Sequence, residues 1–297
     1  MKTKRKFLGV AAAAAMLFSA ASAQAGPVIL GGDDLTDHGS RVAGANQNGW
    51  LYIEKAISNL LTFQTRAGVH TSDIAALGSS ADLTFTNSNA GGAIGSAANV
   101  LGKTVSFIDT AASITQFFAD LAAGTINPAV IWLPGNGAAN DLDAAEGAAL
   151  TANASAINAF VASGGGLMAH GSGSTAYGWL GALLPGLLEV SGCNSTGATL
   201  TAAGNAAFPG LANSNVDANA GPCHSHFAGN FGGLTTLAFD GSNPRLSYII
   251  GGGSGTVIQC GLPGQPPCST NVPEPGTLPL LALAVLGLAA IKRRRTV

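Results

Sequence analysis

Residues 26–262 predict a single α/β domain in which helices flank a mostly parallel sheet. Short, continuous apolar runs recur along this segment, and buried strands of parallel sheets have that composition because both of their faces are covered. The longer segments between the runs repeat apolar residues with helical spacing. Glycine-rich turns follow several of the runs. Alternation of these two kinds of segment is typical of a sheet built from strand–helix–strand units.

The first half of the domain begins with a strand at residues 27–30, which ends at the turn Gly31-Gly32. A helix is expected over 50–61, because Trp50 and the apolar residues that follow it form one stripe. Residues 64–103 are rich in Ser, Asn, Gly and Ala. We expect an irregular insert there, with one strand at 83–86.

The second half resumes the alternation of strands and helices. Strands are expected at 104–108, 129–133 and 167–170, and helices at 111–122, 143–162 and 177–184. Asn140 or Asp141 is expected to cap the helix that begins at Asp143. Residues 193–232 are expected to be loop-rich. The last expected strands are 234–239, 246–250 and 256–258.

The amino terminus has the three parts of a secretory signal peptide. A basic segment over residues 2–6 precedes an apolar run over 7–21, and Ala23-Gln24-Ala25 fits the small-x-small pattern of a cleavage site. We predict that signal peptidase cuts after Ala25, so that the signal peptide is residues 1–25. An uncleaved anchor helix is the alternative. Partners therefore include the export machinery and signal peptidase.

The carboxyl terminus combines three unlike blocks. The triplet Pro273-Glu274-Pro275 precedes an apolar run over 278–291 and a basic cluster over 292–295. This combination resembles the PEP-CTERM sorting signal of Gram-negative bacteria. The resemblance implies that an exosortase removes the tail, and that the protein is released or attached at the surface of an exopolysaccharide-producing cell. A plain membrane anchor is the alternative for residues 273–297, and a linker over 263–272 joins this tail to the domain.

The apolar run of the tail is short for a permanent membrane anchor. As a helix, residues 278–291 would extend about 21 Å, whereas the hydrocarbon core of a bilayer is about 30 Å thick. The basic residues after it would stay on the cytoplasmic side. We therefore predict that this helix anchors the chain in the inner membrane only transiently, before the protein reaches the cell surface.

Charge excludes some classes of partner. The chain has 13 Lys and Arg and 15 Asp and Glu, but the two terminal segments hold eight of the basic residues and only one acidic residue. The body between them keeps 5 basic and 14 acidic residues, a formal charge of −9. Nucleic acids and anionic membranes bind basic surfaces, so neither is an expected partner. Extracellular polysaccharide remains as a further expected partner.

The four cysteines predict disulfides. They are Cys193, Cys223, Cys260 and Cys268, and an even number of cysteines in an exported chain favours pairing. Three connectivities are possible. We favour Cys193–Cys223 and Cys260–Cys268, because these pairs close the shorter loops. A metal site around Cys223-His224-Ser225-His226 is the alternative, although no second Cys-x-x-Cys pair accompanies it.

The segments 127–137 and 164–173 resemble the class I glutamine amidotransferase-like fold, which is flavodoxin-like. Each has a buried strand followed by a glycine-containing turn, and the opening strand that ends at Gly31-Gly32 also fits. The resemblance implies a nucleophilic cysteine in the second turn. Gly171 occupies that position and no cysteine lies in the segment, so amidotransferase chemistry by a thiolate is excluded.

Polar residues follow the ends of several expected strands. In a parallel sheet, ligands bind beyond the carboxyl ends of the strands. The residues expected at this edge are Asp33, Asp34, His38, Asn136, His170 and Ser172. Ser172 could act as a nucleophile with His170 as base and Asp33 or Asp34 as orienting acid. Alternatively, the carboxylates and imidazoles could hold a divalent cation, or the segments could be solvated turns without a ligand.

Together these patterns predict an exported protein of the cell surface or the exopolysaccharide. Its α/β domain is expected to have a binding or structural role and no catalytic activity. No cofactor is expected. The alternative is an extracellular hydrolase that uses Ser172 and His170, or a bound divalent metal, at the sheet edge.

Overall fold

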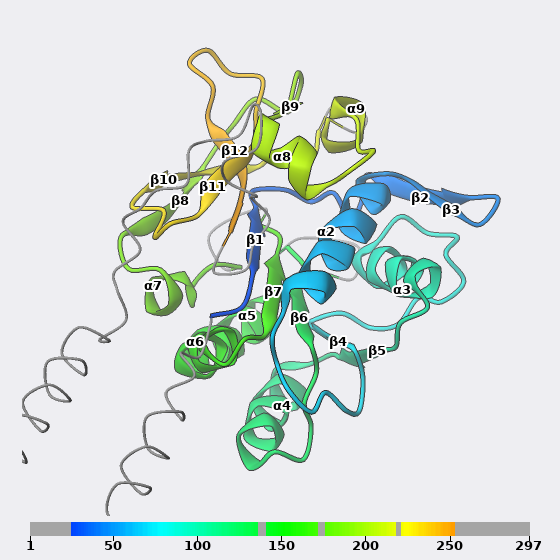
Figure 1. Ribbon diagram of the computed structural model, residues 1–297, viewed down its shortest axis with the longest axis vertical. Helices are drawn as coiled ribbons and strands as arrows, with labels where there is room; N and C mark the ends of the chain where they lie inside the picture. Colours follow the sequence, from blue (N-terminus) through cyan, green and yellow to red (C-terminus); the bar gives the residue numbers. More distant parts are fainter. Residues whose placement is uncertain (1–24, 136–140, 172–175, 218–220, 253–297) are drawn as a thin grey trace, which may run out of the picture. The chain divides into compact units, whose positions relative to one another are not determined.

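The computed structural model describes residues 25–135, 141–171, 176–217 and 221–252. A ten-stranded mixed sheet lies at the centre, in the order β5-β4-β6-β7-β1-β12-β10-β8, with β11 paired to β12 and β9 (Figure 1). Its strands are β1 (Val28–Gly31), β4 (Ile74–Leu77), β5 (Val105–Ile108), β6 (Val130–Leu133), β7 (Gly166–Ala169), β8 (Leu187–Ser191), β9 (Thr199–Leu200), β10 (Ser225–Gly229), β11 (Thr235–Phe239) and β12 (Ser247–Gly252).

Helices cover both faces of the sheet. They are α2 (Gly49–Phe63), α3 (Ala90–Leu101), α4 (Ala111–Ala123), α5 (Ala144–Ala152), α6 (Ala154–Ala162), α7 (Leu180–Leu183), α8 (Ala202–Ala207) and α9 (Asn213–Val216). Side chains of α2 and α3 pack with Ile29 and Trp132 on one face. Side chains of α4, α5 and α6 pack with Leu30 and Ile131 on the other face. Because neighbouring strand residues point to opposite faces, each parallel strand contributes to both cores.

The parallel half agrees closely with the sequence-based expectation. Strands β5, β4, β6, β7 and β1 pair in parallel, and each is fully or partly buried. The expected α/β class and the single domain are therefore confirmed. The expectation of a mostly parallel sheet is wrong for the other half, because β12, β10, β8, β11 and β9 pair antiparallel.

The segment 64–103 is not an irregular insert. It contains β4 and α3, while no strand forms at 83–86. Helix α3 is rich in Gly and Ala because it packs against α2 at close range. A Cβ atom at Gly92 would lie 2.9 Å from the Trp50 ring. The Asn89 side chain accepts a hydrogen bond from the Gly92 N–H and so caps the helix.

Three other expectations need correction. The helix expected over 143–162 is two helices, α5 and α6, divided at Asn153. The helix expected over 177–184 is shortened to α7. The loop-rich segment 193–232 contains β9, α8, α9 and β10. The expected strand 256–258 lies outside the described residues.

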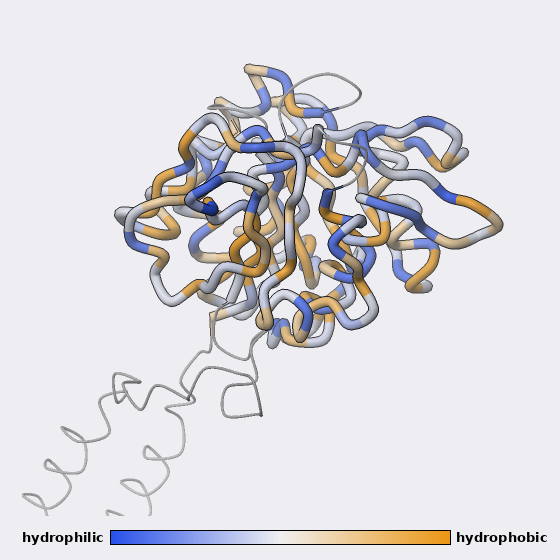
Figure 2. Tube along the Cα trace, turned by 90° about the horizontal axis from the view of Figure 1, so that it is seen from above, coloured by the Kyte–Doolittle hydropathy of each residue, from blue (hydrophilic) through white to orange (hydrophobic). Residues whose placement is uncertain are grey.

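A two-stranded hairpin, β2 (Gly39–Val42) and β3 (Ala45–Asn48), stands apart from the main sheet at the right of Figure 1. Its tip is hydrophobic (Figure 2), and Val42 is 59% exposed. The Arg41 guanidinium lies over the Phe85 ring, 4.8 Å from its centroid, and donates a hydrogen bond to the Asn99 side chain. These contacts fix the hairpin against α3.

Cys193 and Cys223 form a disulfide, as expected. Cys260, Cys268, residues 1–24 of the expected signal peptide, and the tail with its apolar run 278–291 lie outside the described residues. Within the residues that the structure describes, no helix is long and apolar enough to cross a membrane.

Candidate functional site

The candidate site lies where β1 ends, next to the disulfide-bearing segment. The Gly32 carbonyl accepts hydrogen bonds from the N–H groups of His224 and Ser225, at 2.9 and 3.1 Å. A Cβ atom at Gly32 would lie 1.9 Å from the Ser225 carbonyl oxygen, so only glycine permits this approach. Gly32, directly after β1, therefore brings Asp33 and Asp34 against the segment that carries Cys223 and His224.

Asp33, His170 and Trp132 form a buried chain of hydrogen bonds. All three side chains are fully buried. The Asp33 Oδ1 atom lies 2.6 Å from His170 Nδ1, and the Trp132 indole N–H donates to His170 Nε2 at 3.2 Å. An indole nitrogen can only donate. Nε2 is therefore the acceptor, and Nδ1 carries the proton that His170 donates to Asp33.

This arrangement bears on the hydrolase alternative. A histidine base in a Ser-His-Asp triad takes the serine proton on the nitrogen that does not face the carboxylate. In this protein that atom is Nε2, and it already accepts the hydrogen bond from Trp132. To act as a base, His170 would have to exchange this bond for one to a serine hydroxyl. Ser172 lies outside the described residues, so its distance to His170 is not defined.

Aromatic rings enclose the buried chain. The Tyr52 and His170 rings meet edge to face with centroids 6.3 Å apart. The Trp132 and His170 centroids are 5.6 Å apart. The Tyr52 hydroxyl is buried and has no hydrogen-bond partner within the described segments. Burial, together with the nearby Asp33 carboxylate, raises the pKa of Tyr52 well above its usual value.

Asp34 bridges two histidines on the solvent side of the site. Its Oδ1 lies 3.3 Å from His38 Nε2, and its Oδ2 lies 2.8 Å from His224 Nε2. Burial opposes ionisation of Asp34, but hydrogen bonds from His224 and His38 outweigh it and lower the pKa of this carboxyl. The hydrogen bond to Asp34 raises the pKa of each histidine. Asp34 thus joins the β1 loop to the disulfide-bearing segment.

Two further carboxylates face this cluster. Burial, followed by the charge of Asp34, raises the pKa of Asp37 to about 6. Burial, followed by the charges of Asp37 and Asp34, raises the pKa of Asp141 to about 8. One buried oxygen of each, Oδ1, has no hydrogen-bond partner among the described residues. The edge of the sheet therefore concentrates acidic groups that resist ionisation.

Asp141 is available for this cluster because it does not cap α5. The expected cap at Asn140 or Asp141 is wrong: Asp143 caps the helix and forms a capping box with Glu146. Glu146 also accepts a hydrogen bond from the Thr110 N–H at 2.8 Å. These bonds satisfy the start of the helix and leave the Asp141 carboxyl facing Asp37 and Asp34.

We predict that the protein is more stable at pH 5 than at pH 8.5. Between about pH 4 and pH 8 the unfolded chain loses the Asp141 proton while the folded protein keeps it, so stability falls as pH rises. The raised pKa values of His38 and His224 act in the same direction. A loss of 1 kcal/mol lowers Tm by roughly 2–4 °C at this chain length. Thermal unfolding monitored by circular dichroism should therefore show a fall of several degrees.

The variant Asp141→Asn should flatten this dependence, because its side chain cannot ionise. Asp82→Asn is the matched control. Hydrogen bonds from Thr84, Asn89 and Asn87 lower the pKa of Asp82 to about 2, so its carboxyl is ionised in both the folded and the unfolded chain above pH 5, and this variant should keep the wild-type pH dependence. Equal slopes in Asp141→Asn and the wild type would contradict the assignment.

The structure brings together some of the residues predicted for the site. Asp33 contacts His170, and Asp34 contacts His38, whereas Asn136 and Ser172 lie outside the described residues. Sequence reasoning missed Trp132, which looked like an ordinary strand residue, and Asp37 and Asp141. His224 was considered as part of the alternative metal site around Cys223. In the described part of the chain, no group of three or more His, Cys, Asp or Glu side chains is arranged to hold a metal ion.

Comparison with known proteins finds a match at the tail. Residues 271–295 match the PEP-CTERM protein-sorting motif. The chain carries an exosortase sorting signal. The motif implies an exported protein of the cell envelope or surface that exosortase recognises and processes. Neither the curated proteins nor the solved structures include a match to the chain. The resemblance of the body of the chain to the amidotransferase-like fold thus gains no support from a solved structure.

Proposed function

We propose that this PEP-CTERM protein is a non-catalytic binding or structural domain that is retained at the cell surface or in the exopolysaccharide around it. The observation that carries the proposal is the sorting motif over residues 271–295. An acidic body of formal charge −9 and a histidine whose two ring nitrogens are both engaged agree with a role other than catalysis.

Processing at both ends would leave the described domain complete. Strand β1 begins at Val28, three residues after Ala25. The Gly26 N–H donates to the Val161 carbonyl at 2.7 Å, and Gly26 is buried. A cut after Ala25 would thus begin the mature chain at a residue fixed to the fold. At the other end, we propose that residues 278–291 hold the chain in the inner membrane until exosortase acts.

The sorting motif should be required for surface retention. We expect that replacing Pro273-Glu274-Pro275 by three alanines in the native producer removes the protein from the surface fraction. The unprocessed chain should accumulate in the membrane fraction instead, because exosortase would no longer recognise it. Cell fractionation with immunoblotting measures both effects. The variant Pro263→Ala, a proline replacement in the linker, serves as control and should keep wild-type sorting. Undiminished surface retention of the triple-alanine variant would contradict the proposal.

An extracellular hydrolase is the second candidate, because Asp33 and His170 form the hydrogen bond that a Ser-His-Asp site requires. In this candidate Ser172 attacks the substrate, or a divalent metal near Asp34 and His38 activates water. A covalent fluorophosphonate probe distinguishes the serine version from the binding role. Labelling of the wild type but not of Ser172→Ala would favour the hydrolase, whereas the absence of both labelling and bound metal would favour the binding domain.

A further inference from the structure

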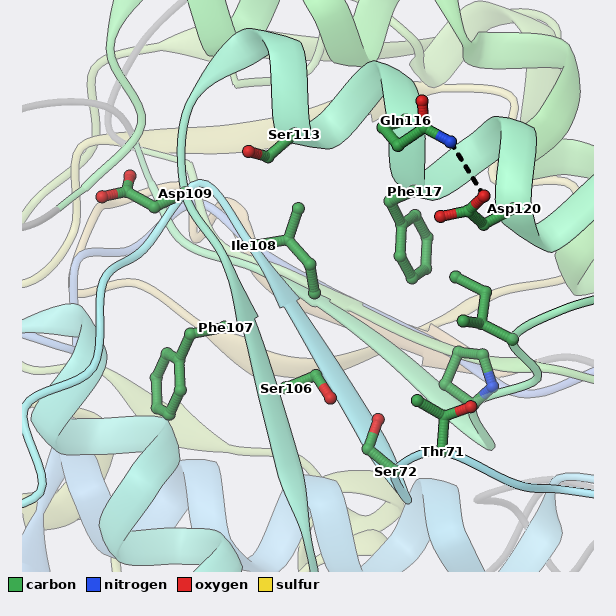
Figure 3. Close-up of a pocket in the computed structure, with 12 residues that line it drawn as sticks. Thr71, Ser72, Ser106, Phe107, Ile108, Asp109, Ser113, Gln116, Phe117 and Asp120 are labelled. Atoms are coloured by element: carbon green, nitrogen blue, oxygen red, sulfur yellow. Dashed lines mark hydrogen bonds between the residues drawn. The ribbon is translucent and has the colours of Figure 1, made fainter.

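A hollow lies at the edge of the parallel strands that is opposite β1. It has a volume of about 460 Å³ and lies between β5, the edge strand of the sheet, and α4 (Figure 3). Small-molecule sites in proteins typically have volumes of about 300–1,000 Å³. The hollow is separate from the Asp33 site, because three strands, β4, β6 and β7, lie between β5 and β1.

Two serines create the hollow. Ser106 of β5 and Ser72, which precedes β4, line it where the same face of the sheet elsewhere carries large apolar side chains such as Leu77 and Ile131. Ser72 is only 7% exposed. Neither hydroxyl has a hydrogen-bond partner among the described residues. Because both side chains line the hollow, water or a ligand there can form hydrogen bonds with these hydroxyls.

Acidic and amide groups lie at the two ends of the hollow. Asp109 and Ser113 lie at one end, and Gln116 and Asp120 lie at the other (Figure 3). Ser113 and Asp120 are seven positions apart on α4, which corresponds to a length of about 10 Å along the helix axis. The Gln116 side chain donates a hydrogen bond to Asp120 Oδ1 at 2.8 Å, which leaves Oδ2 available. The hollow is therefore elongated, with acceptors at both ends and hydroxyls between them.

The lining favours one class of ligand. The described residues that line the hollow include no Lys, Arg or His, so an anion finds no charge partner among them. A single metal ion requires ligands within about 2.6 Å, and the two carboxylates lie too far apart to share one. A linear diamine could reach both carboxylates, but its methylene groups would leave Ser72 and Ser106 unpaired. A neutral ligand with many hydroxyls satisfies both the ends and the middle, while its C–H faces contact Ile108 and Phe117.

We propose that this hollow binds a neutral, polyhydroxylated ligand, a glycan segment of one or two sugar units. The proposal rests on the binding role proposed above and gives that role a site and a ligand class. The carboxylates of Asp109 and Asp120 would accept charge-assisted hydrogen bonds from sugar hydroxyls. The hydroxyls of Ser72 and Ser106 would form further hydrogen bonds with the sugar.

Saturation-transfer NMR on the purified full-length chain tests the proposal. The chain is held in micelles of a detergent without sugar head groups, and the probes are cellobiose, maltose, lactose, trehalose and spermidine. At least one disaccharide should receive saturation from the protein. The signal should vanish in Ser106→Leu, which fills the hollow, and in Asp120→Ala. Thr115→Leu changes an exposed position on the same helix and should keep the signal.

Three outcomes would overturn the proposal: no transfer to any of the disaccharides, transfer to spermidine alone, or disaccharide signals unchanged in both hollow variants. A melting curve of Ser106→Leu shows whether it folds, and Asp120→Ala, at a partly exposed position, provides the test if it does not. Because the protein is purified, failure here is distinct from failure of sorting, which fractionation of cells detects.

Discussion

His170→Ala should destabilise the protein by about 3–5 kcal/mol, because it leaves the Asp33 carboxylate buried without its main partner. Among the described residues, the Asp33 side chain would then keep only the hydrogen bond from the Leu35 N–H, at 3.1 Å. At roughly 2–4 °C per kcal/mol, Tm should fall by about 6 °C or more. Differential scanning calorimetry or thermal circular dichroism measures the change.

The protein contains a matched control for this substitution. His224 pairs with Asp34 at 2.8 Å, but its side chain is 40% exposed. His224→Ala should therefore cost less than about 1 kcal/mol, as solvent-exposed ion pairs do. Trp132→Phe removes the indole donor together with part of a buried ring, and should have an intermediate effect. Equal losses in His170→Ala and His224→Ala would show that burial of the Asp33–His170 pair has no special weight.

Loss of the Cys193–Cys223 disulfide should have the second large effect. The two cysteines are 30 residues apart in sequence, and closing a loop of this length corresponds to about 3.6 kcal/mol in the chain-entropy account. The double variant Cys193→Ala/Cys223→Ala should therefore lower Tm by roughly 7 °C or more. The same disulfide holds the segment that carries His224, so the variant should also weaken the Asp34 bridge.

Reduction provides the control for this prediction. Dithiothreitol should lower the Tm of the wild type towards that of the double variant. It should change the double variant little, apart from any contribution of a Cys260–Cys268 disulfide. A double variant as stable as the oxidised wild type would contradict the proposed weight of this cross-link.

The parallel core of the fold was predictable because its signal is local. The run Val130-Ile131-Trp132-Leu133 forms a strand that is buried on both faces, and its uninterrupted apolar composition predicts this burial. Helix α3 was not predictable in the same way. Its sequence, Ala90 to Leu101, contains three glycines, which weaken the intrinsic preference for a helix. Close packing against Trp50 of α2 stabilises it, and that contact joins segments about 40 residues apart.

The site shows the same division between local and tertiary information. Placing Asp33, Asp34 and His170 at the carboxyl edge of the sheet needed only the expected strand ends. The partners of these residues came from elsewhere: Trp132 donates from a neighbouring strand, and His224 reaches Asp34 across 190 residues. Strand β10 lies in the segment that was expected to be loop-rich, and it forms by antiparallel pairing with β12 and β8, which the local sequence does not reveal.

Terminal peptide mapping by mass spectrometry, on the protein recovered from the surface of its native producer, tests the central claim most directly. We predict a mature chain that begins at Gly26 and lacks the apolar run 278–291 and the basic residues after it. We also predict that Cys193 and Cys223 are joined. Recovery of the intact tail, through Val297, on a secreted product with no surface-retained fraction would contradict the claim that exosortase sorts this protein.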